Sequence, residues 1–201
     1  MTRTVVLVEN VAPASFHVVS VDVPPDLRAV QEVRYEILSS NTRILGAREG
    51  MIRPVMAREI LVTMQVPASA LAGRNAIAEV VFTGHGVTRT TAVEANVRTV
   101  RRTTMSALRD VYGARTGEHL RIPFSITNTG NAADTLQLRA TAPDGWNVML
   151  AERDQVILPP GGSLVTSIRV AVPAGIHMGL SLIHISEPTR LRRISYAVFC
   201  L

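Results

Sequence analysis

HLRIPFSITNTGNAADTLQLRA, residues 119–140, carries the clearest strand pattern in this chain. Apolar side chains occupy every second position on both sides of a central turn, at Leu120, Ile122, Phe124 and Ile126 before it and at Leu136 and Leu138 after it. A period of two places such side chains on one face of a strand. The intervening residues 128–131, Asn-Thr-Gly-Asn, favour a turn. The segment therefore predicts two β-strands that each bury one face.

The same alternation recurs along the rest of the chain. It is found at Val19, Val21 and Val23, at Val33, Tyr35 and Ile37, at Val62, Met64 and Val66, and at Trp146, Val148 and Leu150. Turns rich in proline, glycine, asparagine or aspartate separate these short runs. Short strands between such turns indicate an all-β protein of antiparallel sheets packed as immunoglobulin-like sandwiches.

Two halves of the chain resemble each other. Pro54, Pro67 and Gly73 recur 106 positions later as Pro160, Pro173 and Gly179, and the apolar strand between them recurs as well. We therefore expect two tandem sandwiches, the first at 1–98 and the second at 99–179. In the first half two further strand-like runs, Ala76–Thr83 and Thr90–Val97, follow Gly73. The second half has no such runs, so we expect it to be incomplete by about two strands, with an exposed edge and poor solubility.

Residues 180–201 resemble the translation of a sequencing adapter. LSLIHISEPTR, at 180–190, and ISYAVFCL, at 194–201, are separated by three residues that take the place of a sample index. We expect this tail to be foreign to the protein and disordered, so that the natural chain continues beyond Gly179. The tail holds the only cysteine, together with three Arg and one Glu, so without it the net charge of +5 falls to +3.

The second half also carries a family pattern. Its residues are Asn128, Thr129, Gly130, Asn131, Asp134, Thr135, Gly145, Trp146, Pro160, Gly161, Ser163, Val172, Pro173, Ala174 and Gly179. In these residues the segment 117–179 resembles the bacterial immunoglobulin-like repeats called NPCBM-associated domains, relatives of cell-adhesion-related repeats. The first half shares only the V-P-A-x-x-x-x-G close that ends at Gly73. The resemblance implies modules of extracytoplasmic, multi-domain proteins, many of them carbohydrate-active enzymes or surface proteins.

The residues of this pattern have structural interpretations. Phe124 and Trp146 lie in the apolar alternation and are expected in the core. Gly130 is expected to supply a positive φ, and Pro173 and Gly179 to shape the closing turn. These five residues are the predicted core and turn positions of the second sandwich.

Composition argues against several classes of function. All 21 basic residues are arginine, a pattern that GC-rich coding explains better than nucleic-acid binding, and no apolar stretch is long enough to cross a bilayer. The dispersed histidines show no metal spacing, and no nucleophile motif occurs, so we expect no metal, no cofactor and no enzyme activity. Arg98, Arg101 and Arg102 form a charged connecting segment that is a candidate contact for anions.

Three functions remain open. The first is a non-catalytic spacer or protein-contact module that contacts other domains of the same polypeptide or surface proteins. The second is an accessory module of a glycoside hydrolase that binds or positions carbohydrate, although aromatic residues make up only 4% of the chain. The third is a periplasmic chaperone-like assembly protein with an exposed edge strand. The resemblance implies a bacterial, extracytoplasmic location, and since residues 1–8 form no signal peptide, we expect the export signal to lie upstream of Met1.

Overall fold

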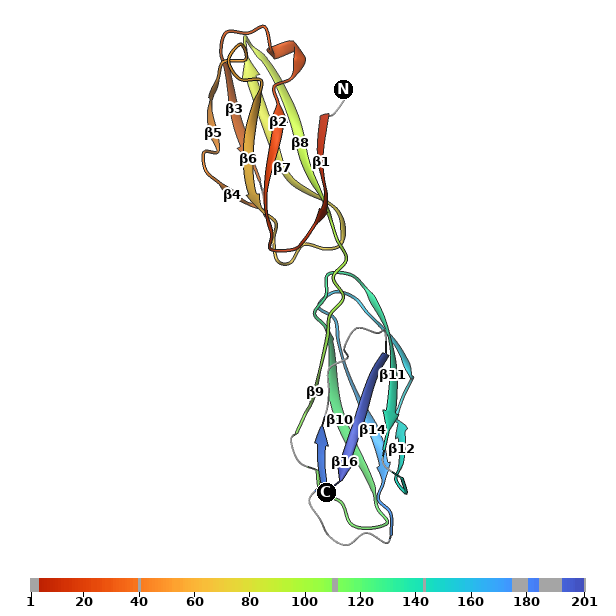
Figure 1. The fold of residues 1–201 in the computed structure, drawn as a ribbon. Helices are drawn as coiled ribbons and strands as arrows, with labels where there is room; N and C mark the ends of the chain where they lie inside the picture. The colour runs from red at the N-terminus through yellow and green to blue at the C-terminus, as the bar shows by residue number, and fades with distance from the viewer. Residues whose placement is uncertain are drawn as a thin grey trace. The chain divides into compact units, whose positions relative to one another are not determined.

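The protein is all-β, as its sequence predicts. A computed structural model describes residues 4–39, 41–109, 112–142 and 144–174, together with the backbone of 181–184 and 193–200. Within these residues the only helical element is the short 3-10 helix η1 (Pro25–Leu27), and no helix is long and apolar enough to cross a membrane. The chain divides into two compact units, Met1–Thr99 and Val100–Leu201 (Figure 1).

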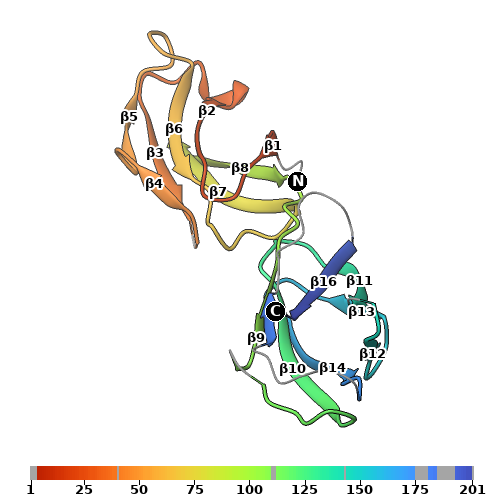
Figure 2. The same cartoon turned by 60° about the horizontal axis from the view of Figure 1, so that its bottom comes forward.

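The first unit contains two sheets. Its strands are β1 (Thr4–Val11), β2 (Phe16–Asp22), β3 (Val33–Leu38), β4 (Arg43–Leu45), β5 (Glu49–Ile52), β6 (Glu59–Gln65), β7 (Gly73–Gly84) and β8 (Val87–Val97). They form a five-stranded sheet in the order β1-β8-β7-β3-β5 and a three-stranded sheet in the order β2-β6-β4. β1 runs parallel to β8, and the other pairs are antiparallel. Figure 2 views the same sheets from a second direction.

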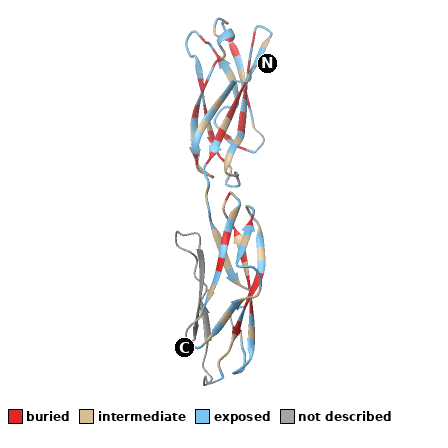
Figure 3. Ribbon diagram, turned by 90° about the vertical axis from the view of Figure 1, so that its right-hand side faces the viewer, coloured by how far each residue is buried: buried red, intermediate tan, exposed pale blue. Residues whose placement is uncertain are grey.

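The predicted alternation fills the core of this unit. The inward rows are buried at Val19, Val21 and Val23 and at Val62, Met64 and Val66. The predicted runs around Gly84-His85-Gly86 form the hairpin of β7 and β8, where His85 and Gly86 both have positive φ. Two such residues match the twist of a tight antiparallel hairpin. Figure 3 shows buried residues alternating with exposed ones along the strands.

The second unit contains two four-stranded sheets. Its strands are β9 (Thr103–Ala107), β10 (His119–Asn128), β11 (Asp134–Thr141), β12 (Asn147–Leu150), β13 (Gln155–Leu158), β14 (Ser163–Ala171), β15 (Ser181–His184) and β16 (Arg193–Cys200). The sheet orders are β12-β14-β10-β9 and β13-β11-β16-β15. Its buried core consists of Ile122, Phe124, Ile126, Leu136, Leu138, Leu158, Ile168 and Val170.

Five consecutive strands pair in the same way in both units. β6 lies between β2 and β4 as β14 lies between β10 and β12, and β5 pairs with β3 as β13 pairs with β11. Met64 stands opposite Ile44, and Val170, 106 positions later, stands opposite Val148. The first strands differ, because β1 joins β8 in one sheet of its unit whereas β9 pairs with β10.

Two segments of the tail, residues 181–184 and 193–200, form β15 and β16. β16 pairs with β11, whose free backbone groups an extended segment can satisfy. It runs parallel to β11, whereas β7 runs antiparallel to the corresponding strand β3. The tail strands therefore do not reproduce the arrangement of the first unit.

Candidate functional site: an asparagine turn that holds the connector

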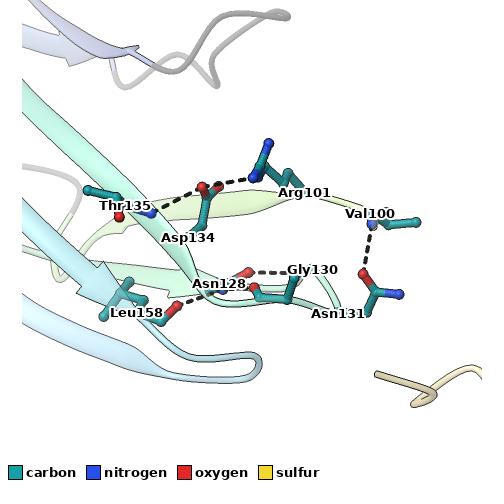
Figure 4. Close-up of polar contacts among 9 residues, drawn as sticks. Val100, Arg101, Asn128, Gly130, Asn131, Asp134, Thr135 and Leu158 are labelled. Atoms are coloured by element: carbon teal, nitrogen blue, oxygen red, sulfur yellow. Dashed lines mark hydrogen bonds and ion pairs between the residues drawn. The ribbon is translucent and has the colours of Figure 1, made fainter. Parts of the chain in front are cut away.

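The turn between β10 and β11, residues 128–131, lies against the segment that enters the second unit. We call residues 98–102 the connector. Figure 4 shows Val100 and Arg101 of the connector beside Asn128, Gly130 and Asn131 of the turn. The predicted turn therefore lies beside the connector in the structure.

Asn128 is fully buried at the base of this turn. Its Nδ2 donates to the carbonyl oxygens of Ala132 and Leu158, both at 2.9 Å, and its Oδ1 accepts from the backbone N–H of Gly130 at 2.9 Å. Its own backbone exchanges hydrogen bonds with Gly161 and Gly162, at 2.8 and 2.9 Å. A buried amide is costly unless its donors and acceptors are satisfied. Asn128 therefore ties two turns of the unit together.

Asn131 binds the connector directly. Its Oδ1 accepts a hydrogen bond from the backbone N–H of Val100 at 2.7 Å, and its own N–H donates to the Val100 carbonyl oxygen at 3.0 Å. Two residues further along the connector, the carbonyl oxygen of Arg102 accepts a hydrogen bond from the N–H of Thr129 at 2.8 Å. Thr129 Oγ1 donates to the same carbonyl oxygen at 3.3 Å, so four hydrogen bonds attach residues 100–102 to the turn.

The backbone conformation of Gly130 differs from the one that the sequence predicts. Its φ is not positive, unlike that of six other described glycines. A Cβ at this position would instead lie 2.4 Å from the carbonyl oxygen of Val100 and 3.0 Å from the backbone nitrogen of Arg102. Glycine is needed here because the connector passes too close for a side chain.

The connector is also attached on the side of the first unit. The backbone N–H of Arg98 donates to the carbonyl oxygen of Val11, the last residue of β1, at 2.8 Å. Only Thr99 separates this anchored residue from Val100. The chain therefore passes from one unit to the next through a very short segment.

The structure assigns different surroundings to the three connector arginines. Arg101 Nε lies 3.4 Å from Asp134 Oδ1, and the carboxylate also accepts a hydrogen bond from the N–H of Thr135. Arg98 and Arg102 are exposed. Arg101 is thus engaged by a carboxylate of its own unit, which weakens its role in the predicted anion contact.

The other predicted positions lie apart from the turn. Phe124 is buried in the second core, and Trp146 is half-buried and packs against that core just before β12. Pro173 is half-buried after β14. Gly179 lies outside the described residues, but Gly73, its counterpart in the first unit, has a φ of +99°. Among the described residues no group of three or more His, Cys, Asp or Glu could hold a metal ion.

Two contacts were not predicted from the sequence. One is the attachment of Val100, and the other is the link between Asn128 and Leu158. The parity of the strand carried a signal for the second, because Asn128 continues the even-numbered row of Ile122, Phe124 and Ile126 that faces the core. Nothing in the local sequence identifies Val100 as the partner of Asn131, since 31 positions separate them.

Part of the chain matches a known protein family. Residues 114–186 match the family described as "NPCBM-associated, NEW3 domain of alpha-galactosidase". No curated protein matches the chain.

Two solved structures are similar over nearly the whole chain. One is a protein of unknown function from Porphyromonas gingivalis W83, with 15% identity, 96% of each chain covered and a TM-score of 0.34. The other is the CsuC-CsuE chaperone-tip adhesion subunit pre-assembly complex from archaic chaperone-usher Csu pili of Acinetobacter baumannii, with 8% identity, coverage of 100% of this chain and 98% of that one, and a TM-score of 0.40. These low TM-scores support no argument about function. Residues 114–186 are thus similar to the NPCBM-associated domains, which is the resemblance that the sequence motifs predict.

Proposed function

We propose that this chain is a non-catalytic spacer and protein-contact module of a larger extracytoplasmic bacterial protein. The observation that carries the proposal is the attachment of the connector at both ends, by Arg98 to Val11 and by Val100 to Asn131. Flexible linkers rich in glycine and serine let domains move independently. A connector with one residue between two anchored positions has few freely rotating bonds, which supports a spacer role.

The sequence of the turn supports the same role. Asn128, Gly130 and Asn131 belong to the family pattern, and in this structure they satisfy buried backbone groups or make room for the connector. Each net hydrogen bond of this kind contributes about 0.5–1.5 kcal/mol to stability. The pattern therefore serves the attachment of the domain to the preceding chain.

The experiment is a comparison of rotational diffusion by 15N relaxation in the 201-residue chain and in a variant with Gly-Ser-Gly-Ser inserted after Thr99. The spacer proposal predicts one common correlation time for both units in the parent chain. In the insertion variant the two units are expected to tumble faster and with different correlation times. Equal, fast tumbling of the units in both proteins would remove the basis of the proposal.

A second candidate function is that of an accessory module that positions carbohydrate for a glycoside hydrolase. The description of the matched family, which names alpha-galactosidase, favours it. Titration of the chain with an α-galactoside such as melibiose separates the two candidates, with the fluorescence of Trp146 followed in the parent chain and isothermal titration calorimetry used for both the parent chain and the variant. Saturable binding that is lost in Trp146→Ala would support the accessory role, and an unchanged spectrum at millimolar sugar would reject it.

A further inference from the structure

We propose that the free edge of β2 in the first unit binds an extended peptide segment of a partner polypeptide. The segment would add antiparallel to β2, with apolar side chains at alternate positions and a basic residue at its amino end. This site is independent of the spacer role, because β2 is not part of the connector or of the turn that holds it.

The order of the smaller sheet leaves one side of β2 without a neighbouring strand among the described residues. The sheet order is β2-β6-β4, so β6 pairs with one side of β2 only. The N–H of Val23 donates to the Arg58 carbonyl, and the N–H of Val66 donates to the Ser15 carbonyl. Backbone groups in an antiparallel ladder point alternately to the two sides. The N–H and C=O groups of Phe16, Val18 and Ser20 therefore point to the free side.

Three large apolar side chains are exposed on the face beside this edge. Phe16 and Val18 of β2 are 60% and 63% exposed, and Leu61 of β6 is 67% exposed. Leu61 stands opposite Ser20, next to Val18 along the sheet. Residues 16–21 contain no Asp, Glu, Lys, Arg or Pro, and their pairing with β6 shows no register shift, so they lack the devices that usually protect edge strands from pairing. The edge is thus able to accept a further strand.

The second unit shows how such a strand is accommodated. β9 pairs antiparallel with β10, the strand that corresponds to β2, and its Met105 packs against the core. In the first unit the initial strand β1 instead pairs with β8 in the other sheet. The position that β9 fills by pairing with β10 has no counterpart strand beside β2 among the residues described. This contrast favours antiparallel addition.

Charge at the end of β2 specifies the orientation of the guest segment. Asp22 stands directly opposite Glu59, and like charges in this position repel each other. Ser20 Oγ donates to Glu59, and Arg28 lies 3.3 Å from Asp22, whose side chain is still 72% exposed. The amino end of an antiparallel guest would lie beside Asp22. A basic residue there would complement the two carboxylates.

A second copy of the chain fits this edge less well than a peptide. Edge-to-edge pairing of two copies would use the seven residues of β2 from each one. Stable interfaces between folded proteins use about 20–30 residues a side. An extended peptide needs no such area, because its main-chain hydrogen bonds provide much of the affinity.

The test uses the 15N-labelled full chain and the capped peptide Arg-Thr-Val-Thr-Val-Thr-Val. With arginine opposite Asp22, its valines would fall beside Ser20, Val18 and Phe16. We expect saturable shifts of the amide signals of these three residues, and weaker binding of the reversed peptide, which carries arginine at its carboxyl end. Shifts that map to another part of the chain, or equal binding of both peptides, would overturn the proposal.

Two variants and one control variant extend the test. Val18→Lys is expected to weaken peptide binding about tenfold or more, since a lysine on an edge strand opposes pairing. Val165→Lys is the matched control, because Val165 is 57% exposed on β14, an inner strand between β12 and β10. Asp22→Asn should weaken binding of the arginine peptide and reduce its dependence on salt. Equal affinity of the Val18→Lys and Val165→Lys variants, both folded by circular dichroism, would overturn the proposal. So would a dimer of the free chain that already protects these amides.

Discussion

Asn131 and Val100 form a reciprocal pair of hydrogen bonds, with Asn131 Oδ1 accepting at 2.7 Å and the Val100 carbonyl oxygen accepting at 3.0 Å. The side chain and the backbone N–H of Asn131 thereby link the turn to the connector through two hydrogen bonds. Asn131 is buried, with 8% of its surface exposed. The pair accounts for the asparagine at the end of the N-T-G-N turn.

Asn131→Ala removes the acceptor for the Val100 N–H. The free energy of unfolding of the second unit is expected to fall by about 1 kcal/mol, because one partly buried hydrogen bond is lost. Urea unfolding of the full chain measures the change. The exposed Asn147 provides the control, and Asn147→Ala should change stability by less than about 0.5 kcal/mol. Equal effects of both substitutions would contradict the role of Asn131.

Gly130→Ala places a methyl group where the structure leaves no room. Since the new Cβ would lie 2.4 Å from the Val100 carbonyl oxygen, the connector must shift, and we expect a loss of about 1–3 kcal/mol. Gly113→Ala is the comparison, because a Cβ there meets nothing within 4 Å. Differential scanning calorimetry should show a lower Tm for Gly130→Ala only. A Tm unchanged in both variants would refute the close approach.

Phe82 and Phe124 are the largest fully buried side chains of their respective units, with relative exposures of 0% and 2%. Replacing either one by alanine should cost about 3–5 kcal/mol through lost burial and the cavity left behind. If each unit folds around its own core, Phe82→Ala should shift the unfolding of the first unit and Phe124→Ala that of the second. Hydrogen exchange resolved by residue distinguishes this result from a single transition that moves as a whole.

Arg101→Ala tests the charged part of the connector. The ion pair with Asp134 is long at 3.4 Å, and Arg101 is 51% exposed, so its contribution should be about 0.2–1 kcal/mol. Raising the salt concentration should reduce the difference between parent and variant. If Arg101→Ala at high salt lowered the free energy of unfolding as much as Asn131→Ala does, Arg101 would have a structural role beyond this ion pair.

The sequence predicted much of the fold because strand periodicity depends on local residues. Val62 and Met64 are buried at alternating positions as predicted, and the hairpin at His85 follows from its turn residues. The reason for Gly130 could not be predicted, since it depends on the approach of Val100 from 30 positions away. The free side of β2 could not be predicted from the sequence either, because it depends on β1 pairing with β8 rather than with β2, the strand that follows it in the sequence.

Amide hydrogen exchange at Val100 tests the attachment of the connector most directly. If this attachment is present, the Val100 amide exchanges slowly in the parent chain, and Asn131→Ala makes it exchange fast while the Arg98 amide, bonded to Val11, stays protected. Exchange of Val100 at the rate of an unprotected amide in the parent chain would contradict it, because the connector would then be free on the side of the second unit.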